Sequence, residues 1–160
     1  MCIRDSYRGL IDIYRNNFKT PFKNFDLYML FLERGLEWLC EKGKLGFICS
    51  DQFMTAFYGR KLRDYLLKKS SLKHIIDFGD SGVFRDVTNY PCILILENGL
   101  QANVIKCVRV NAPMPDILAA IRSNIHHETY NTESFLIFPA SQKSLTCNVW
   151  TLAPKREAQI

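Results

Sequence analysis

Long apolar runs are missing from this chain of 160 residues. Its longest apolar run, around residues 91–96, has the length of a strand, whereas a membrane-spanning helix needs about 20 apolar residues. The first residues hold neither an apolar core nor a cleavage signal, which excludes a secretory signal peptide. Repeats and low-complexity tracts are missing too. With 48% hydrophobic residues, the sequence predicts a globular domain with no membrane association.

Paired cysteines are also missing. None of the six cysteines belongs to a Cys-x-x-Cys pair, which makes a zinc site improbable, and we expect no metal. Cys49, Cys92 and Cys107 lie in apolar, strand-like patterns, where a free thiol acts as a small apolar side chain. We therefore expect no disulfides and a reducing, cytoplasmic environment.

Two short motifs suggest chemistry that the rest of the chain does not support. Asp77-Phe78-Gly79 matches a metal-binding tripeptide of protein kinases, but the His-Arg-Asp and Gly-rich loops of kinases are absent. His126 and His127 resemble metal ligands. Adjacent side chains point apart on a helix or a strand, so we interpret both histidines as surface residues.

Apolar periodicity predicts alternating helices and strands. Recurrence every three to four residues predicts helices over 10–18, 27–38 and 58–66. We expect Asp26 to cap the second helix and Gly43 to end it in the left-handed conformation. Leu27, Leu30, Phe31, Gly35 and Trp38 form the expected apolar stripe of that helix, and basic residues of the third helix are expected on its solvated sides, namely Arg60, Lys61, Arg63, Lys68 and Lys69.

Short apolar runs predict three strands, over 45–49, 72–78 and 91–96, the first of them buried on both faces. Alternation over 103–110 predicts an edge strand, and 116–121 fits a short helix. Further on, polar and aromatic residues mix without a period, which we interpret as a linker or the start of another domain. The order predicts the α/β class, as the C-terminal half of a Rossmann-like sheet with flanking helices. The formal net charge of +5 suits a polyanionic partner without requiring one.

Four segments in this order resemble the N6-adenine DNA methyltransferases of restriction-modification systems, of the Taq-like and type IIG class. They are Asp-Leu-Tyr-Met-Leu-Phe-Leu-Glu-Arg-Gly-Leu (26–36), Gly-Lys-Leu-Gly-Phe-Ile (43–48), Arg-Lys-Leu-Arg-Asp-Tyr-Leu-Leu (60–67), and Val-Phe (83–84) before a strand. They are similar to the motifs numbered V to VIII in that family. The resemblance covers roughly residues 7–110.

The resemblance implies transfer of a methyl group from S-adenosylmethionine to the N6 amine of adenine in double-stranded DNA. The target adenine is flipped out of the stack, as is common for chemistry on a buried base. It also implies a prokaryotic protein with a restriction nuclease fused or associated. The family's Asn-Pro-Pro-Tyr segment and Gly-rich cofactor loop are absent, so we expect no catalytic residue in this chain.

We accordingly expect a fragment that is inactive alone. Residues 1–6 resemble adapter-derived sequence and are interpreted as a non-native leader. Residues 7–110 would be part of the catalytic domain, and 111–160 a linker and the start of a truncated target-recognition region.

The resemblance assigns roles to a few side chains. Phe31 matches the aromatic that borders the adenine ring of the cofactor, the alternative being core packing. Phe84 matches the aromatic that stacks on the flipped base, the alternative being a loop anchor on the sheet. Arg85, Asn89 and Tyr90 either contact DNA phosphates or are simply solvated.

Asp51 and Asp77 end two predicted strands, where ligands collect in open α/β sheets. Either carboxylate lines the cofactor cleft or serves a cap or turn.

Two other functions remain open. One is a related methyltransferase that acts on RNA or on a protein glutamine. The other is a non-catalytic DNA-binding module with a degenerate methyltransferase fold. A substrate screen separates the first, and binding of DNA without affinity for the methyl donor identifies the second.

Overall fold

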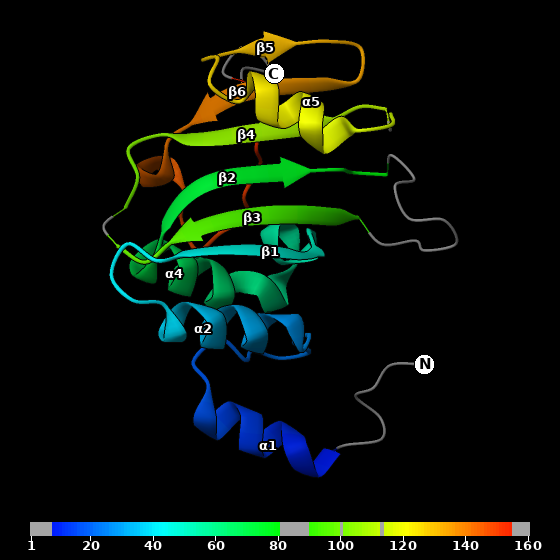
Figure 1. The fold of residues 1–160 in the computed structure, drawn as a ribbon. Helices are drawn as coiled ribbons and strands as arrows, with labels where there is room; N and C mark the ends of the chain where they lie inside the picture. The colour runs from blue at the N-terminus through cyan, green and yellow to red at the C-terminus, as the bar shows by residue number, and fades with distance from the viewer. Residues whose placement is uncertain (1–7, 81–89, 100, 113, 155–160) are drawn as a thin grey trace.

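The computed structural model describes residues 8–80, 90–99, 101–112 and 114–154 (Figure 1). The helices are α1 (Arg8–Asn17), α2 (Tyr28–Trp38), α3 (Gln52–Thr55), α4 (Arg60–Lys69) and α5 (Ile117–Asn124), with short 3-10 turns η2 (Phe57–Gly59) and η3 (Gln142–Ser144). The strands are β1 (Lys44–Ser50), β2 (Ser71–Asp77), β3 (Pro91–Glu97), β4 (Ile105–Val110), β5 (Tyr130–Asn131) and β6 (Phe135–Ala140). In this part of the chain no helix combines the length and apolarity that a membrane span requires.

The strands form one mixed sheet in the order β1-β3-β2-β4-β6-β5. The central β2–β4 pair is parallel, and β3 runs antiparallel to both β1 and β2. As a result β1 and β2 point the same way, and their last residues lie at the same edge of the sheet as the first residue of β3. We call this edge the carboxyl edge and the opposite edge the amino edge. The prediction of a mixed α/β domain is confirmed.

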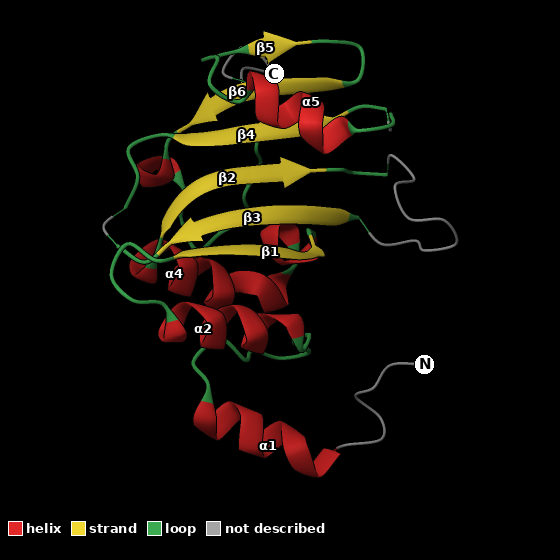
Figure 2. Ribbon diagram, viewed as in Figure 1, coloured by secondary structure: helices red, strands yellow, loops and turns green. Residues whose placement is uncertain are grey.

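Helices cover the two faces of the sheet unequally (Figure 2). Helices α2 and α4 pack on one face, where Leu62 and Leu66 join Leu94 and Leu96 in the larger core cluster. On the other face α5 covers the later strands, and Ile117 and Ile121 share a smaller cluster with Val108 and Val110. The first cluster also receives α1, through partly buried Ile11, Tyr14 and Phe18, as the periodicity predicted.

Only part of the predicted apolar stripe of α2 faces the core. Leu30 is buried as predicted, but Phe31 and Trp38 are 66% and 80% exposed, and the other buried residues of the helix are Met29, Leu32, Glu33 and Leu36. The apolar residues lie almost all round this helix, so their periodicity did not define one stripe.

The buried acid of that inward face, Glu33, has a specific role. Its carboxylate accepts hydrogen bonds from the backbone N–H groups of Lys19 (2.8 and 3.0 Å) and Thr20 (2.8 Å). The bonds tie the segment after α1 to α2 and compensate for the cost of burying a carboxylate.

Both predicted boundary residues of α2 were wrong. Leu27, not Asp26, occupies the N-cap position, and the cap makes no side-chain hydrogen bond. After the helix, the left-handed conformation belongs to Lys42 (φ 61°), not to Gly43. Gly43 instead lies close under the turn, where an added Cβ would come within 2.9 Å of the Cys40 carbonyl oxygen.

The roles of β1 and β4 in the sheet differ from the predicted ones. β1 is the edge strand here, and Ile48 on its outer face is 54% exposed, so the expectation of burial on both faces is wrong for this chain. β4 was expected at an edge but lies between β2 and β6.

Beyond residue 110 the chain continues the same sheet. The short helix expected over 116–121 is α5, and β6 pairs with β4 along its whole length. Trp150 is 2% exposed and packs edge-on against Phe53, 5.9 Å between ring centroids. The sheet therefore shows no break at residue 110, although the assignment of the later residues to a recognition region stays a prediction.

Candidate functional site

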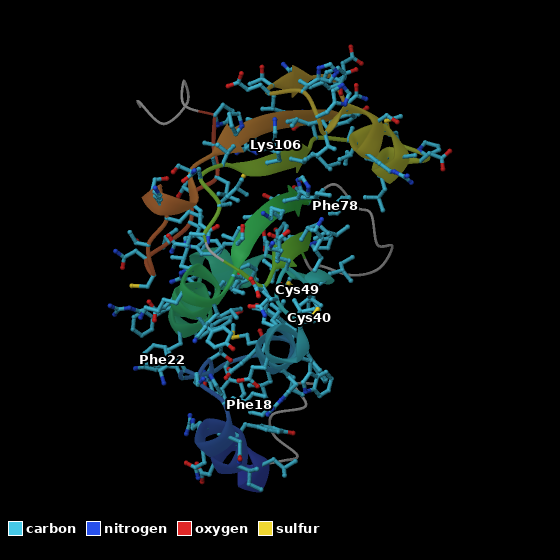
Figure 3. All side chains as sticks on the ribbon, turned by 60° about the vertical axis from the view of Figure 1, so that its left-hand side comes forward. Phe18, Phe22, Cys40, Cys49, Phe78 and Lys106 are labelled. Carbon is cyan, nitrogen blue, oxygen red and sulfur yellow. The ribbon has the colours of Figure 1, made fainter. Side chains whose placement is uncertain are left out.

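The carboxyl edge brings together the ends of β1 and β2 and the start of β3. Backbone hydrogen bonds hold these ends in place: the N–H of Asp51 donates to the Tyr90 carbonyl (2.8 Å), and the N–H of Phe78 donates to the Pro91 carbonyl (3.1 Å). Figure 3 labels Phe78 and Cys49 near the ends of β2 and β1. Side chains of this edge come from three separate stretches of sequence, so only the folded sheet unites them.

Two acids stand at the strand ends. Asp51 is half-buried, and burial together with the neighbouring Asp77 raises the pKa of its carboxyl group. Asp77 accepts a hydrogen bond from the N–H of Gly79 (2.9 Å), which confirms its turn role, and Gly79 takes the left-handed conformation there (φ 49°). Among the ion pairs of the described residues, neither acid has a basic partner. The nearest basic residue in the strand register is Arg109, which lies beside Asp77 in the β2–β4 pair.

Sequence reasoning missed Tyr28, which lies near Cys49 and Cys92 at this edge. Its hydroxyl is buried and has no hydrogen-bond partner among the described residues. Burial, with smaller contributions from Tyr58 and Cys49, raises its pKa, so the phenol stays protonated. Its ring lies edge-on to Phe53 at 6.5 Å. Only its position three residues before Phe31 on the same helix hinted at a shared site.

Two thiols meet beside Tyr28. Cys49 and Cys92 are paired across β1 and β3, with their sulfurs 3.8 Å apart. The hydrogen bond to Cys49 and burial raise the pKa of the Cys92 thiol. Cys107 is buried as well, which raises its pKa to about 12. Thiols held in the protonated form are poor nucleophiles, so Cys92 and Cys107 are poorly suited to covalent catalysis.

Phe31 projects from the first turns of α2. Its two neighbours in sequence, Leu30 and Leu32, are buried, while its own ring is exposed. This placement contradicts the core-packing alternative. Tyr28, one turn earlier on the same helix, lies against the carboxyl edge, so the first turn of α2 is beside that edge. Whether Phe31 contacts a cofactor stays a prediction.

Of the other predicted site residues, the structure describes one. Phe84, Arg85 and Asn89 lie outside the described residues. Tyr90 is described: it is 43% exposed, and its carbonyl belongs to the carboxyl edge through its bond with Asp51. Its predicted contact with DNA phosphates stays a prediction.

His126 and His127 are both exposed, as expected, but the reason given for it was wrong. Their rings lie 4.1 Å apart, and His127 stacks on Tyr130 at 5.2 Å. The two histidines stand in a turn after α5 rather than in a regular element, so their side chains do not point apart. Within the described ranges no cluster of three His, Cys, Asp or Glu residues could hold a metal ion.

Comparison with known proteins gives a consistent picture. The family model for the Eco57I restriction-modification methylase matches residues 4–84. The type II restriction enzyme and methyltransferase RM.Eco57I of Escherichia coli is 41% identical over 86 residues, which are 54% of this chain and 9% of that protein.

Solved structures share the fold at low sequence identity. The type IIG restriction endonuclease BpuSI superposes with a TM-score of 0.67 at 15% identity, covering 89% of this chain and 18% of that one. A putative class I S-adenosylmethionine-dependent methyltransferase of Listeria monocytogenes gives a TM-score of 0.57 at 19% identity, covering 72% and 38%. The chain thus spans a small part of the proteins that it matches.

Proposed function

This chain belongs to the Eco57I restriction-modification methylase family, and we propose that it is part of an adenine-specific DNA methyltransferase. The intact protein would transfer a methyl group from S-adenosylmethionine to the N6 amine of an adenine flipped out of double-stranded DNA. It would act in the cytoplasm of a prokaryotic cell, with a restriction nuclease fused or associated. The chain would supply one wall of the active site.

The observation that carries this proposal is the ring of Phe31. A phenyl ring 66% exposed between two buried leucines contributes little to the core, and the first turn of its helix lies beside the edge at which ligands bind in open α/β sheets. A flat apolar ring suits the adenine of S-adenosylmethionine, since purines stack on aromatic side chains.

The acids of the carboxyl edge fit the polar part of the same molecule. S-adenosylmethionine carries positive charge on its sulfonium and ammonium groups. The carboxylate of Asp51 lies near Asp77 without a basic partner among the described ion pairs, so a cationic ligand would relieve their repulsion. When bound, S-adenosylmethionine would supply the methyl group. Asp51 would orient it, and Phe31 would fix the plane of its adenine.

The target base would be held from the other side of the edge. We propose that Phe84 stacks on the flipped adenine and that Arg85, Asn89 and Tyr90 contact the phosphates around it. Tyr90 is the described member of this group, and its exposure at the start of β3 supports the assignment. None of these side chains activates the amine. We therefore propose that the catalytic group belongs to another part of the intact protein.

The test is methyl transfer by the intact protein from labelled S-adenosylmethionine, followed by separation of the nucleosides. Label in N6-methyladenine of duplex DNA is the expected result. If the label appeared in RNA or in a glutamine-containing protein instead, that molecule and not DNA would be the substrate. DNA binding without affinity for the methyl donor would identify a non-catalytic module. The 160-residue chain alone is expected to transfer nothing, and turnover by it would refute this division of roles.

A further inference from the structure

Two segments far apart in sequence meet beneath the carboxyl edge. Segments 13–25 and 52–63 contain no aspartate or glutamate. They are joined by the rings of Phe22 and Phe57, whose centroids are 5.3 Å apart. Figure 3 labels Phe22 on the outer side of the molecule, near the segment between α1 and α2. Each segment alone has only a few more basic than acidic residues. The contact between the two segments brings these basic side chains together on one surface.

Lysines from the two segments cross over the aromatic pair. The ammonium group of Lys23 lies 5.6 Å from the ring centroid of Phe57, and that of Lys61 lies 5.7 Å from Phe22. Exposed cation–π contacts contribute about 0.5–1 kcal/mol each, enough to favour these positions of the two ammonium groups. With the exposed Arg60, these side chains form what we call the basic–aromatic surface: Phe22, Lys23, Phe57, Arg60 and Lys61.

The surface is not neutralised by nearby acids. Asp12 lies 3.9 Å from Arg15, and Asp64 pairs with Lys68 at 2.7 Å. In the described part of the chain, no ion pair includes Lys23, Arg60 or Lys61. Lys19 adds a further exposed ammonium group close by, 6.0 Å from the Tyr65 ring. The charge of this surface is therefore available to a partner.

The turn that carries Phe57 is held rigidly. Arg63 is 2% exposed, contrary to its predicted place on a solvated side, and its guanidinium donates to the carbonyls of Phe53, Ala56 and Cys147. At Gly59 an added Cβ would overlap the Phe53 carbonyl oxygen, which leaves space only for glycine. Phe57 is nevertheless 61% exposed. The fold thus fixes an aromatic ring in solvent instead of burying it.

We propose that the basic–aromatic surface binds the sugar-phosphate backbone of duplex DNA without regard to sequence. Exposed cations that form no ion pair with a described residue attract phosphates, which supply most of the affinity in such contacts. The surface also lies on the segment that leaves the end of β1, so DNA at the carboxyl edge can extend over it. The proposal rests on DNA being the substrate, and it adds a contact that orients the duplex rather than reads it.

The experiment measures binding of a short fluorescent duplex to the 160-residue chain by anisotropy over a range of salt concentrations. The triple variant K23Q/R60Q/K61Q is expected to bind about tenfold more weakly at low salt. Its log–log salt slope should be smaller by about 0.9 for each phosphate that the variant no longer neutralises. Circular dichroism checks that the variants fold, and their exposed positions predict that they do.

The matched control is K42Q/K44Q/K69Q, which removes the same charge from exposed residues near the amino edge. It should leave the salt slope nearly unchanged. Equal losses of affinity in both triple variants, or no DNA binding by the unmodified chain, would overturn the proposal. So would competition by polyglutamate as strong as that by unlabelled duplex, which would indicate an acidic polypeptide partner. The methyl-transfer assay of the intact protein is read independently, so failure of the surface is distinguishable from failure of the function.

Discussion

The two edges of the sheet use their polar side chains in different ways. At the amino edge, Gln142 is 1% exposed, and its amide oxygen accepts from the N–H groups of Leu72 (2.9 Å) and Ala102 (3.0 Å). Its amide nitrogen donates to the Ser70 carbonyl (2.8 Å). Asn98 ties the end of α2 to the turn after β3 in the same manner. Neutral amides here hold backbone to backbone.

At the carboxyl edge Asp77 also accepts from a backbone N–H, that of Gly79, but two other ionisable side chains stand out. Tyr28 has a buried hydroxyl without a partner among the described residues, and the pKa of Asp51 is raised by burial and by Asp77. The amino edge is not free of unsatisfied groups, because the hydroxyl of Ser71 is also buried and has no hydrogen-bond partner in the described ranges. At the amino edge Glu97 forms an ion pair with Lys73 (3.0 Å), whereas Asp51 and Asp77 lie near each other at the carboxyl edge and have no ion pair among the described residues. We therefore expect the amino edge to contribute mainly to stability, and we propose that ligands bind at the carboxyl edge.

The largest effect is expected from Gln142→Leu. The substitution leaves two buried N–H groups and one carbonyl without partners, and should lower the free energy of unfolding by about 3–5 kcal/mol. Urea unfolding of the 160-residue chain measures it. Gln101→Leu is the matched control, since that exposed side chain makes one hydrogen bond to the described residues, to the Leu67 carbonyl, and its loss should cost less than about 1 kcal/mol. Equal losses of stability at the two glutamines would show that the three hydrogen bonds of Gln142 contribute no more to stability than the one bond of Gln101.

Tyr28→Phe should act in the opposite direction. It removes a buried hydroxyl that has no partner in the described structure, so the free energy of unfolding should rise by about 1 kcal/mol. Ser71→Ala, at the other edge, tests whether any unpaired hydroxyl behaves this way, and the same sign is expected there. A loss of stability in Tyr28→Phe alone would mean that the phenol has a hydrogen-bond partner, and the carboxyl edge would then resemble the amino edge.

Asp51→Asn should give a smaller gain that depends on pH. The pKa of Asp51 is raised above the ordinary 3.8, so the folded chain holds its proton to higher pH than the unfolded chain. Stability is therefore lost as pH rises through the folded pKa, and Asn avoids this loss. The variant should be more stable at neutral pH by less than about 1 kcal/mol, because the group is half-exposed, and equally stable below the ordinary pKa.

A double-mutant cycle identifies the source of that gain. Asp77→Asn keeps the acceptor for the N–H of Gly79 and removes the same repulsion. If the acids repel each other, the double variant should gain less than the sum of the two single gains. Additive gains would show that burial alone raises the pKa of Asp51.

Periodicity and composition predicted the α/β class and most of the elements before β4, because strongly patterned segments carry their own signal. Both failed where tertiary contacts decide which side chains are buried and which strands pair. Glu33 is drawn inward by two backbone N–H groups of another segment, and that choice turns Phe31 outward. The strands β5 and β6 lie in a stretch that mixes polar and aromatic residues, and β6 pairs with β4, which lies about 30 residues earlier in the sequence. At the site, Phe31 was selected by a resemblance and its exposure was not predicted, whereas Tyr28 needed the contact between α2 and β1.

The smallest effect on stability is expected from Phe31→Ala. The exposed ring should contribute no more than about 0.5 kcal/mol to folding, whereas Leu32→Ala, one residue away, should cost about 2–5 kcal/mol because its side chain is fully buried. In the intact protein Phe31→Ala should weaken S-adenosylmethionine binding by about tenfold or more, since stacking on a base contributes about 1–3 kcal/mol. Calorimetry measures that affinity, and Phe31→Tyr, which keeps a flat ring, should preserve it. If Phe31→Ala destabilised the fold yet bound the methyl donor normally, this part of the carboxyl edge would be structural and the contrast between the two edges would fail there.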